Sequence, residues 1–334
     1  MDIINSKYVF FLRKNNIKLN GFDSYSKNSN DILTHYNLKY EELSDNLKSP
    51  QQYKAEKWKY ICSKFDNEIS EIEKYISTPF ELYITAFLLA FDVKYEKSIV
   101  LFQKCQALLP DTLYGNINVV FINLQIAQLY ERIGLYHHAF SILIKTRYTI
   151  SKDKELFYHV HNFYASSCVS IGMLCFRYFN TPNIAKSCIL TSIIIRTKYK
   201  HTYMPSVYKH YIAQAYRYIA MMSYDSHKNA YLFLQTSYKI RQELLQIYLD
   251  DVTQEEMFHL ETDFIIFLIR NQFKTSFINL HSKSLLKLIA GFSPKLREQL
   301  YSNVQNIASM LYRYYSFFQM KRKAKLWYNM MNYK

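Results

Sequence analysis

The side chains that could do chemistry in this sequence are its histidines, its cysteines and a few adjacent carboxylates. His159 and His161 are two residues apart, so on a helix they point to different sides, and with Cys168 they lack the spacing of a metal site. The adjacent carboxylates Glu255 and Glu256 are better explained as the start of a helix, where they would interact with the helix dipole. We therefore expect no metal site and no cofactor.

The motifs of the common enzyme classes are absent. The chain holds five glycines, too few for a phosphate-binding glycine loop, and it has no G-x-S-x-G, H-E-x-x-H or protein-kinase motif. We expect that the protein is not an enzyme and that it acts by binding. A site that grouped His159 or His161 with carboxylates would instead favour an enzyme with unrecognised chemistry.

The elements that must position a binding site are helices. Five glycines and six prolines in 334 residues leave few residues for the tight turns that join strands. Apolar residues make up 49% of the chain, enough to bury a large core. The composition therefore predicts an all-α fold of long helices with short connections.

A recurring order of small and large residues predicts that these helices form tetratricopeptide-like pairs. One such repeat is about 34 residues long, and its small residues let two helices approach while its large residues fill the gap between them. Residues 79–112 and 120–153 follow this order in matching phase. The matching residues are Ala86, Tyr95, Ser98, Phe102, Cys105 and Pro110 in the first stretch, and Ala127, Gly134, Tyr136, Ala139 and Leu143 in the second.

Later repeats are longer and less regular. We expect Ala185 and Ala230 to take the place that Ala139 has in its repeat, although their spacings of 46 and 45 residues exceed the usual length. A last pair would carry Ala324 and Tyr328 at its packed positions. The fold class predicted is a tetratricopeptide-like helical-repeat superhelix, and the alternative is a non-repetitive helical bundle.

The first 50 residues differ in being polar and rich in Asn and Ser. Ser49-Pro50 marks a boundary, because the residue before proline resists helix. We therefore predict a small N-terminal helical segment at residues 1–50 and a repeat domain at residues 51–334.

Stacked helix pairs expose the inner side of their first helices as a binding surface. In the two regular repeats this surface would combine aromatic pockets with amide and guanidinium groups, which suits an extended peptide. An alternative for the aromatics is that they form the core between repeats. The predicted peptide-binding residues are Tyr83, Phe87, Gln128, Glu131, Arg132, Arg177 and Tyr178.

The formal net charge of +15 favours a polyanionic partner, which could be nucleic acid, an acidic protein surface or anionic lipid. The C-terminal stretch is especially basic, because no acid follows Glu298. Its aromatic residues could form a homodimer interface or cap the repeat array. The basic residues of this stretch are Arg313, Lys321, Arg322, Lys323, Lys325 and Lys334.

The sequence favours a protein of the cytoplasm that does not enter a membrane. Five cysteines without a C-x-x-C pair are typical of buried thiols in a reducing compartment. The N-terminus has no apolar segment of a secretory signal, and the longest apolar run, residues 80–91, is too short to span a bilayer.

With these features the chain resembles the peptide-pheromone receptors of Gram-positive bacteria and their phages, the RRNPP group with its Rap-like and AimR-like proteins. The resemblance is architectural and is carried by residues 79–153 and, more loosely, 182–241, where Asn183-Ile-Ala-Lys and Lys228-Asn-Ala-Tyr precede helices. It implies a short secreted and re-imported signalling peptide, bound in the concave face, that switches an output.

The resemblance implies that this output is transcription or the binding of another protein. An N-terminal helix-turn-helix would contact DNA phosphates through Arg13, Lys14, Lys18 and Lys27, although the residue spacing typical of that motif is missing. The alternative function is a helical-repeat interaction scaffold or chaperone that does not bind DNA.

Overall fold

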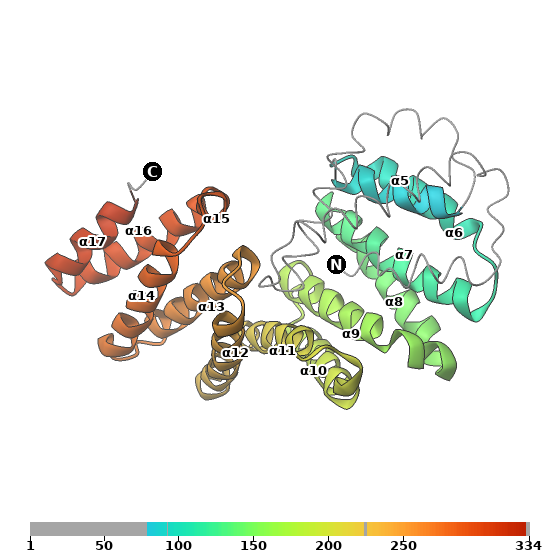
Figure 1. The fold of residues 1–334 in the computed structure, drawn as a ribbon. Helices are drawn as coiled ribbons and strands as arrows, with labels where there is room; N and C mark the ends of the chain where they lie inside the picture. Colours follow the sequence, from blue (N-terminus) through green and yellow to red (C-terminus); the bar gives the residue numbers. More distant parts are fainter. Residues whose placement is uncertain (1–78, 92, 224–225, 332–334) are drawn as a thin grey trace. The chain divides into compact units, whose positions relative to one another are not determined.

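The computed structural model describes residues 79–91, 93–223 and 226–331, and within these ranges every regular element is a helix (Figure 1). The chain divides into two compact units between Tyr208 and Lys209, so the division falls inside the repeat domain predicted for residues 51–334. The predicted boundary at residue 50 lies outside the described residues.

The part of unit 1 that the structure describes consists of three consecutive helix pairs. Each second helix packs against the first helix of its own pair and, where another pair follows, against the next first helix. The helices are α5 (Pro79–Phe91), α6 (Tyr95–Ala107), α7 (Leu113–Arg132), α8 (Tyr136–Lys152), α9 (Lys154–Arg177) and α10 (Pro182–Lys198), followed by the short 3-10 turn η1 (Lys200–Thr202).

Small residues bring the helices of each pair together, as the sequence predicts. Ala86 and Ser98 are fully buried, and the Ser98 hydroxyl donates a hydrogen bond to the Ala86 carbonyl at 2.5 Å across the α5–α6 pair. Ala139 and Ala185 are also fully buried in α8 and α10. Since these positions recur in register, the predicted tetratricopeptide-like repeat is confirmed.

The helix boundaries explain why the repeats are longer than the usual length. The first helix of the second pair begins at Leu113, before residue 120, because the Thr112 side chain accepts a hydrogen bond from the Gly115 amide at 3.1 Å and caps the helix there. Gly134, with φ of 83°, makes the turn into α8. The 24-residue helix α9, kinked at Val160, then adds the extra residues between Ala139 and Ala185.

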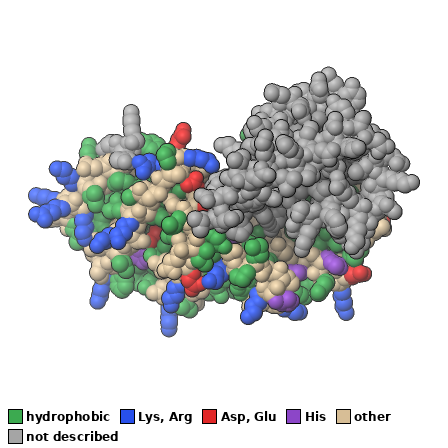
Figure 2. Space-filling view, in the orientation of Figure 1, with side chains coloured by type: hydrophobic (Ala, Val, Ile, Leu, Met, Phe, Trp, Pro, Cys, Tyr) green, Lys and Arg blue, Asp and Glu red, His purple; other side chains and the backbone are tan. Residues whose placement is uncertain are grey.

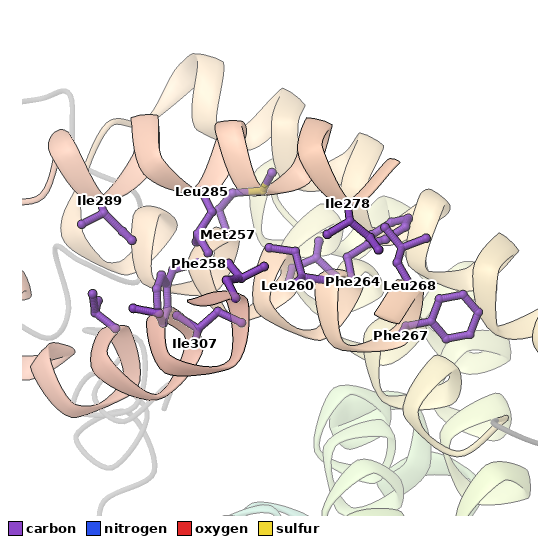
Figure 3. Packing of buried hydrophobic residues seen from close by; sticks show 14 of the residues in the cluster. Met257, Phe258, Leu260, Phe264, Phe267, Leu268, Ile278, Leu285, Ile289 and Ile307 are labelled. Atoms are coloured by element: carbon purple, nitrogen blue, oxygen red, sulfur yellow. The ribbon is translucent and has the colours of Figure 1, made fainter. Parts of the chain in front are cut away.

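Unit 2 is built around α13, which is buried over most of its length between neighbouring helices (Figure 3). The Asp250 side chain caps α13 by accepting a hydrogen bond from the Thr253 amide at 2.9 Å. Its helices are α11 (Pro205–Met221), which begins in unit 1 and enters unit 2 at Lys209, α12 (His227–Ile247), α13 (Asp251–Arg270), α14 (Thr275–Ala290), α15 (Pro294–Gln299), α16 (Tyr301–Phe317) and α17 (Lys321–Met331).

Two sequence interpretations in unit 2 were wrong in detail. In α17, Trp327 is 1% exposed and fills the gap against α16, whereas Tyr328, predicted there, is 51% exposed. Because an indole buries more apolar surface than a phenol, the helix turns its Trp327 side inward. Glu255 and Glu256 lie beyond the first turn of α13, and Glu256 is an ion-pair partner of Arg241 at 2.9 Å.

Candidate functional site

Three of the predicted binding residues lie at the C-terminal end of α7. Gln128 and Arg132 are exposed and one turn apart, so they share one face of the helix, and Glu131 beside them is half-buried. The Arg132 guanidinium donates a hydrogen bond to the Tyr95 hydroxyl at 3.3 Å and lies 5.7 Å from the centre of that ring. The contact with Tyr95 holds the guanidinium in place while leaving the side chain accessible.

The predicted residues of α9 lie next to them. Arg177 ends α9 and is exposed, and Tyr178, which follows it, is 41% exposed. The Tyr178 ring stacks on Tyr136, the first residue of α8, with 3.5 Å between ring centres and 14° between planes. Since α7 packs against both α8 and α9, the two helix ends form one surface.

Electrostatic coupling shows that these groups belong to a single cluster. Burial raises the pKa of the Glu131 carboxyl, while the nearby cations Arg177 and Arg132 oppose that rise. A hydrogen bond with Tyr136 raises the pKa of the Tyr178 phenol, and the Glu131 charge acts in the same direction. We call Gln128, Glu131, Arg132, Arg177 and Tyr178 the α7–α9 cluster.

Tyr83 and Phe87 have a different setting. They are 1% and 2% exposed and pack with each other and with Phe102 and Phe121 in the core between α5, α6 and α7. Their predicted contact with a peptide is untested, and their burial gives them a packing role. Among the predicted residues, the accessible ones are therefore those of the α7–α9 cluster.

Two neighbours of the cluster were not predicted as site residues. Tyr95 and Tyr136 both occupy the aromatic position at the start of a second helix, which the sequence interpretation used only as a mark of the repeat. That position follows the turn of each pair, so it places the ring beside the end of the first helix. The predicted DNA contacts Arg13, Lys14, Lys18 and Lys27 lie outside the described residues.

The histidines that could have supported other chemistry are used within the fold or stand apart. His161 Nδ1 lies 2.8 Å from the Tyr158 carbonyl oxygen and Nε2 lies 3.1 Å from the Thr202 hydroxyl, while His159 is exposed. Within the described residues, no three His, Cys, Asp or Glu side chains gather as a metal site would need. In the same part of the chain, no helix is both long and apolar enough to cross a bilayer.

Comparison with known proteins shows which solved structures share this fold. No family model matches the chain, and no curated protein matches it in sequence. Among solved structures, the apo form of RapI matches with a TM-score of 0.50 and 12% identity, over 90% of this chain and 96% of its own. The fold is that of the tetratricopeptide-like helical-repeat proteins.

A second solved structure matches over a smaller share of the chain. BtubC (BKLC) from P. vanneervenii has a TM-score of 0.55 and 11% identity, over 70% of this chain and 92% of its own. The match to RapI confirms the architectural resemblance to Rap-like regulators. At sequence identities of 11% and 12%, both matches show a similarity of fold alone.

Proposed function

We propose that the protein is a cytoplasmic peptide-responsive regulator that binds a short peptide at the α7–α9 cluster. The single observation that supports this proposal is that Arg132, Arg177 and Tyr178 all lie close enough to Glu131 to interact with its charge. These residues lie at the ends of successive first helices, and all three are exposed.

The chemistry of the cluster suits a peptide with a carboxylate. Two guanidinium groups can each bind a carboxylate through two hydrogen bonds, and the Gln128 amide can pair with a peptide bond. The Glu131 carboxylate offers an acceptor for an amine or an amide N–H. Tyr178 and Tyr136 supply a stacked aromatic platform for an apolar side chain.

We further propose that the output is transcriptional and that Arg13, Lys14, Lys18 and Lys27 contact DNA phosphates. A scaffold that binds a longer protein segment is the second candidate. The observation that favours it is the burial of Tyr83 and Phe87, which leaves the accessible cluster largely polar and without the aromatic pockets expected for a short peptide.

A library of random hexapeptides with free C-termini, panned on the full-length protein, tests the peptide proposal. We expect selected peptides to bind Arg177→Ala and Gln128→Ala variants about tenfold or more weakly, since each loses a hydrogen bond to the ligand, charge-assisted in the case of Arg177. Arg313→Ala removes an exposed guanidinium elsewhere and should leave the affinity unchanged. Selection of no peptide, or equal affinity for all variants, would contradict the proposal. If a parallel library of longer protein segments yields binders and the hexapeptide library yields none, the scaffold is favoured.

A further inference from the structure

The charge of this protein is concentrated at its C-terminal end. Between residues 264 and 334 the sequence holds 12 Lys and Arg residues and one acid, Glu298. Most of the formal net charge of +15 therefore belongs to about a fifth of the chain. Every one of these cationic side chains that the structure describes is exposed, except the half-buried Arg297.

The densest group lies at the turn between α16 and α17. Lys321, Arg322, Lys323 and Lys325 are exposed within the first five residues of α17, which occupy about 6 Å along the helix axis. Figure 2 shows Lys and Arg side chains gathered at the left-hand end of the visible face, where Figure 1 places this turn. Such a density of one charge needs an anionic partner or counter-ions.

Two aromatic rings are exposed at the same turn. Phe317 is 80% exposed and Phe318 is 49% exposed, with 5.1 Å between their ring centres and 85° between their planes. The Met320 amide donates to the Tyr315 carbonyl at 2.8 Å and closes the turn, so the rings lie directly before the basic run. Tyr314 of α16 packs against Phe318, with 4.8 Å between their ring centres.

The combination of rings and cations distinguishes between the possible partners. A second copy of this face would bring like charges together, which opposes a symmetric dimer there. A duplex offers phosphates but keeps its bases stacked away from protein rings, whereas an unpaired strand offers both phosphates and open base faces. Cations spread over α14 to α17, at Lys283 and Lys287 as well as in α17, suit an extended polyanion rather than one insertion point in a membrane.

We propose that the α16–α17 turn is a binding site for single-stranded nucleic acid. Lys321, Arg322 and Lys323 contact phosphates, and the open face of Phe317 stacks on an unpaired base. This site lies in unit 2 and uses no residue of the α7–α9 cluster, so it does not depend on the proposed peptide binding.

Fluorescence anisotropy of the full-length protein with a labelled oligothymidine of about 20 nucleotides tests the proposal. This length exceeds the site size of a typical single-strand-binding module. Binding is measured between about 50 and 200 mM salt, because each phosphate contact on a single strand contributes about 0.7 to the slope of log K against log salt. A Lys321→Gln/Arg322→Gln/Lys323→Gln variant should therefore show a slope shallower by about two.

The aromatic contact gives a different signature. A Phe317→Ala/Phe318→Ala variant should bind roughly tenfold to a hundredfold more weakly at an unchanged salt slope, as expected for the loss of base stacking. Because both rings are exposed, this variant should keep its helical circular dichroism. A Lys97→Gln/Lys104→Gln/Lys145→Gln variant, which removes the same charge from exposed positions of unit 1, should bind as the natural protein does.

Several outcomes would overturn the inference. They are absence of binding to the oligothymidine, an equal loss in the unit 1 control, and no effect of the Phe317 and Phe318 substitutions. Tighter binding to a duplex of the same length would mean that the turn contacts phosphates and does not stack on unpaired bases. Binding to vesicles of phosphatidylserine without binding to the oligothymidine would assign the turn to a membrane surface instead.

Discussion

The buried ion pair between Arg241 and Glu256 makes a quantitative prediction for unit 2. Arg241 is 2% exposed, and its guanidinium also lies 2.9 Å from His210 Nδ1 and donates to the His210 carbonyl at 3.4 Å. Replacing Glu256 with Leu would leave a buried charge without its carboxylate. Loss of one partner of a buried pair costs about 3–5 kcal/mol, and we expect about 3 kcal/mol because the Glu256 side chain is 20% exposed.

Two further variants separate the pair from general damage. Arg241→Met combined with Glu256→Leu removes both charges and should restore stability to within about 1.5 kcal/mol of the natural protein. Lys209→Gln breaks an exposed pair with Glu243 and should cost less than about 1 kcal/mol, since both side chains are solvated.

Urea unfolding followed by tryptophan fluorescence measures these differences in unit 2. The chain has two tryptophans, Trp58 and the buried Trp327, so a Trp58→Phe background leaves the residue in α17 as the reporter. At an m-value of about 2 kcal/mol/M, the single Glu256→Leu substitution should lower the midpoint by about 1.5 M. A midpoint no lower than that of Lys209→Gln would refute the reasoning.

The effect also has a pH signature. Burial is the largest single effect on the Glu256 carboxyl and alone would raise its pKa, but Arg241, His210, Arg217 and His259 together outweigh it and the pKa is lowered. The stabilisation from a lowered pKa is present above the unfolded value, near 4, and is lost as pH falls through the folded value. The cost of Glu256→Leu should therefore shrink in acid.

Three more predictions concern other parts of the fold. Gly172→Ala should lower the free energy of unfolding by about 1–3 kcal/mol in thermal or urea unfolding, because a Cβ there would lie 2.9 Å from Ile189 Cδ1; unchanged stability would mean that α9 and α10 can separate. Gly134→Ala should lower the free energy of unfolding by about 1 kcal/mol in the same assay, because φ of residue 134 is 83°. Unchanged stability would mean that the turn adopts another conformation. Cys105 and Cys168, whose pKa values burial raises to about 12 and about 11, should resist iodoacetamide at pH 8 until the protein is unfolded, as peptide mass spectrometry would show; rapid labelling would contradict their burial.

The sequence predicted those features that depend on local order. Ala86, Ala139 and Ala185 recur at the close approach of paired helices, and each is fully buried. Such positions can be recognised from one chain because only a small side chain allows two backbones to come together there. Arg132 and Arg177 were predicted on the inner side of first helices, and both are exposed.

Features that depend on distant contacts escaped prediction. Arg241 pairs with Glu256 and His210, and nothing in its neighbours along the chain indicates that its charge is buried. Tyr83 and Phe87 face the core because Phe102 and Phe121 close over them, which periodicity alone cannot distinguish from facing a ligand. The division after Tyr208 depends on the balance of contacts in space and leaves no mark such as a glycine or proline run.

The order of packing within each unit has a consequence for how the protein folds. Helices contact chiefly the ones that precede and follow them, as α6 does with α5 and α7, and α13 with α12 and α14. Chains joined in this way close short loops first, so structure can nucleate in any pair and spread outward along the array. One helix pair can accordingly open and reform while helices further along the array remain intact.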